Sequence, residues 1–338
     1  AGFFIIKVCF KFLNDLSVEL HSRDDSSAYP DVIAFAFWCR KANIAKLKTD
    51  FNNKETRLGL GMIFHITPSN VPVNFAFSFV FGLLSGNANI VRVPSNAFPQ
   101  IDIICSAINQ LFLSDRYKEI KAMTSFIRYE QNDEITGMYS LKCNARIIWG
   151  GNLAIRNIRK LAIPERCVDI AFSDKYSICV INASSIIKLD KAEIIRLSES
   201  FYNDTYLMDQ NACSSPHLIV WMGAQKEAAK EKFWTAVSHT ARQKYQLSTI
   251  SAVDKYTMLC QNAIDLNNIS SFKKDGNHLY RIGIEKVNNN TENLRGKFGY
   301  FFEYDTNNIN SISHIINAKY QTLTYFGVDK SELLNFVV

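Results

Sequence analysis

Apolar and polar residues alternate in blocks along this chain, and the clearest block lies in its first third. Residues 61–67 form a short apolar run of buried-strand length, followed at 68–72 by a polar loop bracketed by two prolines. The apolar stretch 74–85 is long enough for a helix and ends at a Gly-Asn pair, a common helix stop. Residues 88–93 resume a strand. We therefore predict a β-α-β unit whose first loop lies where open α/β sheets bind ligands.

The predicted helix at 74–85 carries phenylalanine at four alternate positions, a spacing that a strand would also show. The length of the stretch and its flanking proline and glycine favour a helix. The alternation itself has no explanation in the sequence.

The remaining pattern predicts further strands and helices in alternation, which is typical of an α/β fold with a mostly parallel sheet in each half. A second strand, glycine loop and helix follow one another between residues 145 and 161. We place a domain boundary near residue 171, which gives a first domain at 1–171 and a second at 172–338. The predicted helices are 1–19, 31–48, 100–113, 133–140, 153–161, 192–208 and 227–246, and the predicted strands are 117–130, 145–149, 217–222 and 298–304.

Composition narrows the class of protein. The 338 residues suffice for two domains, and 47% of them are hydrophobic, which indicates a globular chain. The net charge of +6 arises from scattered Lys and Arg, so we expect no nucleic-acid partner, whereas anionic ligands such as nucleotides or coenzyme A fit. The longest apolar run, 71–84, is shorter than the roughly 20 residues of a membrane span. Residues 1–14 lack a signal-peptide cleavage pattern, so we expect a cytoplasmic protein.

The eight cysteines contain no CxxC pair, which argues against a zinc site or a disulfide framework and for reduced thiols. Cys213 differs from the others because it lies in a loop of small polar residues, 209–216, directly before a buried strand. Such a loop lets a substrate reach the sulfur, so Cys213 is either a nucleophile or an ordinary loop thiol. Five cysteines lie in apolar surroundings and are expected to be inert core thiols: Cys9, Cys39, Cys105, Cys179 and Cys260.

Two histidines and a glycine pair are weaker candidates. His217, four residues after Cys213, could activate the thiol, but a histidine at the start of an apolar strand is more often structural. His65 lies inside a buried strand and is expected to be a core histidine. Gly150 and Gly151 do not form a GxGxxG motif, so they are a weak signal for a phosphate cradle.

Three loops together resemble one family. PSNVP at 68–72, WGGN at 149–152 and QNACSSP at 210–216 resemble three active-site segments of the aldehyde dehydrogenase superfamily. The closer resemblance is to the LuxC-type fatty acid reductases of bacterial bioluminescence, through 64–95, FSDKYS at 172–177 and QTLTYFG at 321–327. This resemblance implies a Rossmann-type domain that binds NADP(H) and an α/β catalytic domain. Members of that family are longer, so we expect a stretch to be missing at one or both ends.

The resemblance implies a role for individual residues. Cys213 would be the nucleophile that forms an acyl thioester, and the Asn70 side chain would donate to the developing oxyanion, together with the Cys213 backbone N–H. Asn70 alone would equally suit a turn. Ser69, Gly150 and Gly151 would contact the cofactor, the glycines by letting the nicotinamide half approach the backbone.

Two departures from the superfamily pattern bear on the reaction. Aldehyde-oxidising relatives place a glutamate four residues before Lys175, where this chain has Ala171. That glutamate activates the water that hydrolyses the acyl thioester. Without it, the acyl-enzyme should last long enough to be reduced. A second glutamate, which contacts the cofactor ribose, is replaced by Gly296, and this puts nicotinamide placement in doubt.

The cofactor is expected to be NADPH. The superfamily's Lys-Pro-x-Glu clamp on the adenosine ribose is replaced here by residues 93–96, Val-Pro-Ser-Asn. Asn96 removes the repulsion between a carboxylate and a 2′-phosphate, and Ser95 could donate to that phosphate. Arg92 could also pair with it, although as the strand neighbour of Val93 it should point to the opposite face.

The resulting hypothesis is NADPH-dependent reduction of a long-chain fatty acyl thioester to a fatty aldehyde that supplies a luciferase. The acyl group would come from acyl-CoA or from acyl-protein synthetase and acyltransferase subunits, and we expect a homo-oligomer. One alternative is a short-chain CoA-acylating aldehyde dehydrogenase. Another is a non-catalytic acyl-carrier or structural subunit, which the missing ribose clamps would suit.

Overall fold

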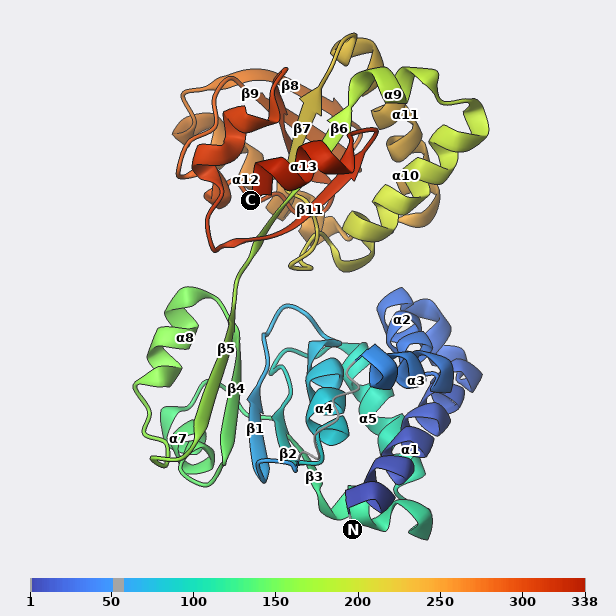
Figure 1. The fold of residues 1–338 in the computed structure, drawn as a ribbon, viewed down its shortest axis with the longest axis vertical. Helices are drawn as coiled ribbons and strands as arrows, with labels where there is room; N and C mark the ends of the chain where they lie inside the picture. Colours follow the sequence, from blue (N-terminus) through green and yellow to red (C-terminus); the bar gives the residue numbers. More distant parts are fainter. Residues whose placement is uncertain (1, 51–57, 338) are drawn as a thin grey trace. The chain divides into compact units, whose positions relative to one another are not determined.

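The computed structural model describes residues 2–50 and 58–337, and the chain divides into two compact units, Ala1–Asp174 and Lys175–Val338 (Figure 1). Each unit has its own β-sheet, as the predicted α/β fold requires. The boundary expected at residue 171 would cut strand β5 (Val168–Ser173), whereas the division follows the end of that strand. The functions assigned to the two halves stay predictions.

The first unit is built on a five-stranded sheet with the order β3-β2-β1-β4-β5, in which every neighbouring pair is parallel. Its strands are β1 Met62–Ile66, β2 Ala88–Arg92, β3 Thr124–Ile127, β4 Ala145–Gly150 and β5 Val168–Ser173. Its helices are α1 Gly2–Ser22, η1 Asp24–Ala28, α2 Pro30–Trp38, α3 Lys41–Asp50, α4 Asn74–Leu84, α5 Pro99–Leu111, η2 Asp115–Tyr117, α6 Lys118–Ala122, α7 Asp133–Ser140 and α8 Asn152–Arg159.

Strand β1 is central and is covered on both faces, which explains its continuous apolar run. Phe64 and Ile66 point toward one face, where they pack in a cluster with Ile155 of α8. His65 points to the other face and contacts Ser78 of α4. Helices therefore cover both sides of this sheet, with α4 and α5 drawn on one side and α7 and α8 on the other (Figure 1).

The alternating phenylalanines of α4 divide between two faces of the helix. Phe79 packs against Phe126 of β3, with ring centroids 5.2 Å apart, and Phe75 contacts the same ring at 5.8 Å. Phe77 and Phe81 pack instead on Trp38 of α2, at 5.3 and 5.4 Å. Each pair is four residues apart and so shares one helical face, one toward the sheet and one toward α2.

The single helix expected at 31–48 is wrong, because α2 ends at Trp38 and α3 begins at Lys41. The break is stabilised by side chains that bond to the end of α2. Asn43 Nδ2 donates to the Phe37 carbonyl over 2.7 Å, and the Arg40 guanidinium lies 3.4 Å from the centre of the Phe37 ring. These contacts replace the backbone bonds that a continuous helix would make.

The range 117–130 was expected to hold a strand with its flanks, and the strand within it is Thr124–Ile127. Residues before it form the 3-10 turn η2 and the short helix α6, where Tyr117 and Ile120 are buried three residues apart. Helical spacing buries both side chains on one face, which a strand would not do.

The second unit is built on a six-stranded sheet with the order β11-β6-β7-β10-β9-β8, parallel except for the antiparallel pair β8 and β9. Its strands are β6 Tyr176–Asn182, β7 Leu218–Met222, β8 Ile269–Asp275, β9 Leu279–Ile284, β10 Tyr300–Asp305 and β11 Tyr320–Phe326. Its helices are α9 Ala183–Lys188, α10 Lys191–Thr205, η3 Tyr206–Met208, α11 Lys226–Lys244, α12 Thr249–Asp265, η4 Thr291–Asn293, η5 Ile309–Ile315 and α13 Lys330–Val337.

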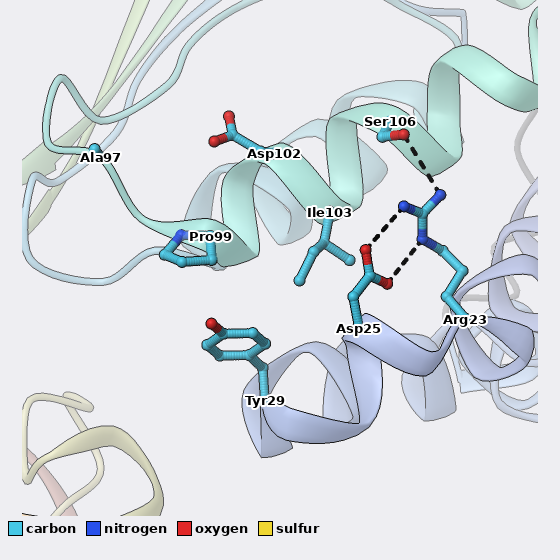
Figure 2. Close-up of a pocket in the computed structure, with 8 residues that line it drawn as sticks. All are labelled: Arg23, Asp25, Tyr29, Ala97, Pro99, Asp102, Ile103 and Ser106. Carbon is cyan, nitrogen blue, oxygen red and sulfur yellow. Dashed lines mark hydrogen bonds and ion pairs between the residues drawn. The ribbon is translucent and has the colours of Figure 1, made fainter.

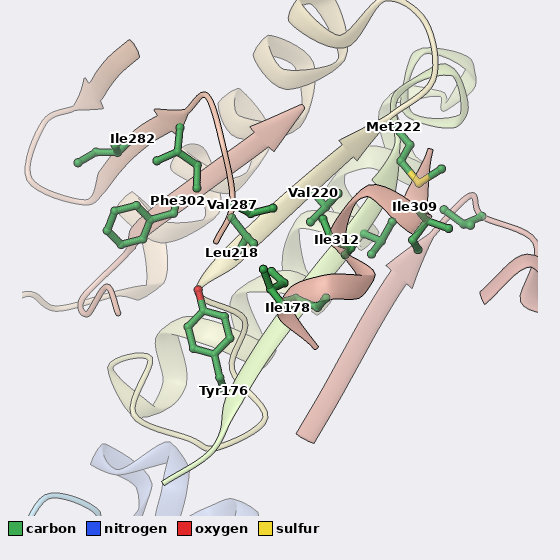
Figure 3. Close-up of a cluster of buried hydrophobic side chains, with 14 of the residues drawn as sticks. Tyr176, Ile178, Leu218, Val220, Met222, Ile282, Val287, Phe302, Ile309 and Ile312 are labelled. Carbon is green, nitrogen blue, oxygen red and sulfur yellow. The ribbon is translucent and has the colours of Figure 1, made fainter. Parts of the chain in front are cut away.

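The central strands of this second sheet are also buried on both faces. Alternate residues of β6, among them Tyr176 and Ile178, join a cluster with Ile312 of η5 on one face (Figure 3). The intervening residues, such as Ile181, join a cluster with Phe233 of α11 on the other. The central strands are thus rigid supports for the loops at their ends.

Candidate active site

The predicted cofactor residues of the first unit, and the predicted catalytic residue Asn70, lie where the parallel strands end. Ser69 and Asn70 follow β1, Ser95 and Asn96 follow β2, and Gly151 follows β4. Because the strands are parallel, all these loops lie at one edge of the sheet. The strand order places β1 between β2 and β4, so the order of the strands reverses between β1 and β4. Open α/β sheets bind ligands at such a switch point, which the loops of Asn70 and Gly151 flank.

A hydrogen bond joins the loops after β1 and β2. Asn96 Nδ2 donates to the backbone oxygen of Ser69 over 3.4 Å. The side chains of Ser69, Asn70 and Asn96 are exposed, and that of Ser95 is half-buried. The exposed amide of Asn70 lies in the turn before α4 and has donors to offer to a bound group.

Arg92, at the end of β2, lies against Tyr129. Its guanidinium carbon is 4.5 Å from the centre of that ring, and Nη2 donates to the Tyr129 carbonyl over 3.3 Å. Its Nε is buried and has no hydrogen-bond partner among the described residues. The guanidinium is therefore held at the edge of the sheet with a donor still to be satisfied.

The two glycines after β4 leave space at the same edge. A Cβ built on Gly151 would meet nothing within 4 Å, and one on Gly150 would meet only the Ala154 side chain at 3.5 Å. Packing within the described chain thus does not require glycine at either position. Gly151 is also the N-cap of α8 and makes no side-chain cap, so N–H groups at this helix end are available to an anion. These features fit a dinucleotide.

His65 is part of a buried hydrogen-bond chain beside this edge. Asn89 Nδ2 donates to the Asn87 carbonyl over 2.8 Å, so Asn89 Oδ1 faces His65 Nε2 at 3.0 Å. Ser78 Oγ lies 2.8 Å from His65 Nδ1 and accepts from Trp149 Nε1 over 3.1 Å. Burial lowers the pKa of His65 to about 4, partly offset by the Asn89 bond, so the ring is neutral. His65 is a core histidine, as expected.

The predicted nucleophile lies in the second unit. The side chain of Cys213 is exposed, in the loop between η3 and β7. Ser177 of β6 donates its hydroxyl to the Cys213 carbonyl over 2.6 Å, and Gln321 of β11 donates Nε2–H to the Cys213 sulfur over 3.2 Å. The thiol is thus both accessible and held in place from two neighbouring strands.

Gln210 secures the start of the cysteine loop. Its buried amide oxygen accepts from the backbone N–H groups of Gly299 and Tyr300, at 3.2 and 3.1 Å. Its Nε2 donates to the carbonyls of Pro216 and Tyr300, at 3.2 and 3.1 Å. Asp209 and Gln210 both have positive φ, 52° and 62°, a backbone conformation that costs energy in residues other than glycine. The four bonds of Gln210 stabilise this turn.

His217 does not serve as a base for Cys213. It is buried, its ring stacks on Tyr176 at 5.5 Å, and its Nδ1 has no hydrogen-bond partner among the described residues. Burial, together with the smaller effect of the positive charge of Arg295, lowers its pKa to about 3. A ring with so low a pKa takes up no proton near pH 7.

Comparison with known proteins identifies the family. The profile of the acyl-CoA reductase (LuxC) family matches residues 43–252, more than half of the chain. The chain belongs to this family. It is therefore an oxidoreductase that acts on acyl and aldehyde groups, and acyl reduction to an aldehyde is the reaction that the family supports. No curated protein sequence matches the chain.

Solved structures similar to this LuxC-family chain are aldehyde dehydrogenases. The NAD-dependent benzaldehyde dehydrogenase of Corynebacterium glutamicum has a TM-score of 0.70 and 12% identity, over 98% of this chain and 78% of that chain. Lactaldehyde dehydrogenase of Escherichia coli has a TM-score of 0.66 and 11% identity, over 98% and 76%. Glyceraldehyde-3-phosphate dehydrogenase GapN of Methanocaldococcus jannaschii, complexed with NADP, has a TM-score of 0.64 and 14% identity, over 98% and 78%. At these identities the likeness shows the fold, and the predicted aldehyde dehydrogenase-like fold is confirmed.

The other cysteines of this LuxC-family chain are not equivalent to Cys213. Cys9, Cys39 and Cys179 are buried, and burial raises the pKa of each thiol. Cys260 was expected to be a core thiol, but it is exposed. The reason is that α12 turns an apolar stripe outward, with exposed Ile250, Val253 and Ile264. Apolar spacing in that helix therefore does not indicate burial.

A cavity of about 510 Å³ lies in the first unit between η1 and α5 (Figure 2). Its charged groups already have partners. Arg23 donates to both carboxylate oxygens of Asp25 and to Ser106, and Asp102 pairs with Arg128. None of the predicted site residues lines it, although Ala97 of its lining directly follows Asn96 in the loop after β2.

Three residues of the cysteine site were not singled out from the sequence: Ser177, Gln210 and Gln321. All three lie inside segments that carry the family resemblance, so that resemblance was the available signal. The described residues contain no group of three or more His, Cys, Asp or Glu able to hold a metal ion. Within the same residues, no helix combines the length and apolar character that crossing a membrane requires.

Proposed function

We propose that this protein reduces a long-chain fatty acyl thioester to a fatty aldehyde with NADPH, through a thioester on Cys213. The observation that carries the proposal is the accessible Cys213 sulfur, in a chain of the acyl-CoA reductase family. This sulfur accepts a hydrogen bond from Gln321, and Ser177 donates to the Cys213 carbonyl. An exposed and positioned thiol suits nucleophilic attack on an acyl group.

In the acylation step, the Cys213 thiolate attacks the carbonyl carbon of acyl-CoA. A new carbon–sulfur bond forms, the bond to the coenzyme A sulfur breaks, and that sulfur leaves as a thiolate that takes a proton from solvent. The backbone N–H of Cys213 would donate to the oxygen that becomes negative in this step, and the family resemblance implies a second donor in the amide of Asn70. The product is an acyl-enzyme in which the acyl group is bound to Cys213.

The first unit would hold the cofactor. Gly150 and Gly151 would admit it at the switch point, and the N-terminal end of α8 would face its phosphates. When bound, a reduced nicotinamide supplies the hydride for reduction of the acyl group. Ser95 and Asn96 support a 2′-phosphate, and hence NADPH.

Two positions depart from the superfamily pattern, and one of them, Ala171, favours reduction over hydrolysis of the acyl-enzyme. Ala171 has a methyl group where aldehyde-oxidising relatives place a glutamate, so this position cannot take a proton from water. At Gly296, a Cβ would lie 1.6 Å from the Tyr300 carbonyl oxygen, so the local backbone excludes any larger side chain. The ribose contact expected there in relatives must be supplied by other residues or be lost.

From the family resemblance we further propose the source of the acyl group, the use of the aldehyde and the oligomeric state. The aldehyde would supply a luciferase, and the acyl group would arrive as acyl-CoA or from acyl-protein synthetase and acyltransferase subunits in the cytoplasm. A homo-oligomer is supported by the exposed side chains of Val168, Ile170 and Phe172 on the edge strand β5.

The test is acyl trapping with radiolabelled long-chain acyl-CoA, followed by NADPH oxidation. Cys213→Ala should abolish both, whereas Cys260→Ala, which removes another exposed thiol, should leave both unchanged. Undiminished acylation of Cys213→Ala would sink the proposal. A series of acyl-CoA chain lengths separates a long-chain reductase from a short-chain enzyme, and fluorescence quenching by NADPH separates an enzyme from a carrier subunit.

A further inference from the structure

Gln321 occupies an irregular position in strand β11. In the parallel pair of β11 with β6, Tyr320 lies opposite Tyr176 and Thr322 lies opposite Ser177. Two steps along β11 therefore match one step along β6, which leaves Gln321 as the extra residue of a bulge. Bulges turn a side chain out of the regular alternation and are common beside active sites.

The bulge directs the Gln321 side chain to the proposed nucleophile. Its Nε2 lies 3.2 Å from the sulfur of Cys213, 108 residues away in the sequence. Ser177, the β6 residue opposite Thr322, donates to the Cys213 carbonyl over 2.6 Å. One pair of adjacent strands thus holds both the backbone and the sulfur of Cys213.

A cysteine nucleophile needs a group that favours its thiolate. His217 cannot supply one, because it is buried and neutral. A side-chain amide can, because its N–H donates to sulfur and the bond is stronger when sulfur is negatively charged. Since an amide neither takes up nor releases a proton near neutral pH, Gln321 would act as a donor and not as a base.

We propose that Gln321 is a further catalytic residue, whose N–H stabilises the thiolate of Cys213. The role of this thiolate in acyl transfer rests on the proposed function above. The donor bonds to the sulfur before the acyl group arrives, loses most of that bond when the sulfur becomes part of a thioester, and regains it when the aldehyde leaves.

The test is the rate of alkylation of Cys213 by iodoacetamide, measured from pH 6 to pH 10 by mass spectrometry of the peptide that contains it. Gln321→Glu keeps the shape of the side chain but removes the donor and adds a negative charge. Alkylation at pH 7 should slow by about tenfold, the size expected for a lost bond to an anionic sulfur. Toward pH 10 the two rates should converge, because high pH favours the thiolate of any cysteine. Gln321→Leu should show the same pattern to a smaller extent.

Gln243→Glu is the matched control, because it adds the same charge to exposed α11, where the Gln243 amide lies 3.5 Å from His239. Its alkylation profile should match the unmodified protein. Identical profiles for Gln321→Glu and the unmodified protein would overturn the proposal, as would an equal slowing at every pH, which indicates altered access. A failure of the proposed function is detected by a different experiment, in which Cys213→Ala would still trap the acyl group.

Discussion

Ser78 Oγ lies 2.8 Å from His65 Nδ1, and this contact links helix α4 to the central strand of the first sheet. The neutral His65 ring accepts the Ser78 hydroxyl hydrogen, and the hydroxyl oxygen accepts from Trp149 on β4. Two central strands and the helix beside them are therefore joined by one polar chain. Because its members are buried, leaving any of them without a partner costs stability.

The hydrogen-bonded side chains of His65 and Asn89 leave no room for a side chain at position 82 of α4. A Cβ on Gly82 would lie 2.0 Å from Asn89 Oδ1 and 3.0 Å from His65 Nε2, so Gly82→Ala should lower the free energy of unfolding by about 2–3 kcal/mol. Gly137→Ala in helix α7 is the control, because a Cβ there meets nothing within 4 Å. It should stabilise by up to about 1 kcal/mol through helix propensity. Urea unfolding measures the free energy of unfolding of both variants. Equal changes in the two would contradict the close approach of Gly82 to Asn89 and His65.

Acid should destabilise the protein through its buried histidines. The pKa of His65 is lowered to about 4 and that of His217 to about 3, from 6.5. The unfolded state therefore binds more protons below pH 6.5, and the free energy of unfolding should fall from pH 6.5 toward pH 4. Each histidine contributes up to about 1.4 kcal/mol per pH unit.

His217→Phe removes one of these titrations and keeps an aromatic ring beside Tyr176. Its free energy of unfolding should depend less steeply on pH, while acyl trapping at pH 7 stays at the level of the unmodified protein. A loss of trapping of a hundredfold or more in this variant, with the fold intact by circular dichroism, would reinstate His217 as a catalytic base.

Asn70→Ala should slow acylation by about 10²–10³-fold, the usual effect of losing one oxyanion donor. Single-turnover acylation with labelled acyl-CoA measures this rate directly. Asn109→Ala, on the exposed face of α5, removes an amide from the same unit and should have no effect. An acylation rate that changes less than twofold in Asn70→Ala would mean that Asn70 only stabilises the turn and is not an oxyanion donor.

Asn96→Glu should reverse the proposed preference for NADPH. A carboxylate in the loop after β2 would repel a 2′-phosphate and accept a hydrogen bond from a 2′-hydroxyl. The ratio of kcat/KM for NADPH to that for NADH should fall by about tenfold or more, since like charges at close range are unfavourable. Asn109→Glu controls for the added charge. An unchanged ratio in Asn96→Glu would show that the 2′-phosphate does not bind beside Asn96.

Gln210→Leu should destabilise the second unit by about 3 kcal/mol or more. It removes the partners of two backbone N–H groups and two carbonyls around the cysteine loop. We expect faster proteolysis between residues 209 and 216 and slower acyl trapping. A variant that resists protease as well as the unmodified protein does would show that the loop is held by other contacts.

Local patterns in the sequence were sufficient for the first β-α-β unit, the glycine pair after β4 and the exposed cysteine loop. Each of these depends on residues that are close in the chain, such as apolar runs that end at Pro or Gly. The resemblance of whole segments then indicated the family. Strand β8 escaped prediction because it is an edge strand with five consecutive exposed residues, and so it carries no apolar pattern.

Only the tertiary structure decided which distant residues meet. The alternating phenylalanines of α4 became intelligible once Trp38 and Phe126 were found on opposite sides of that helix. The contact between Gln321 and Cys213 depends on a bulge between two strands, and the spacing of apolar residues does not encode a bulge. The sequence by itself determined the first β-α-β unit and the candidate nucleophile, because these follow from local hydrophobicity and loop chemistry. The partners of that nucleophile depend on strand pairing over 108 residues, which only the folded chain establishes.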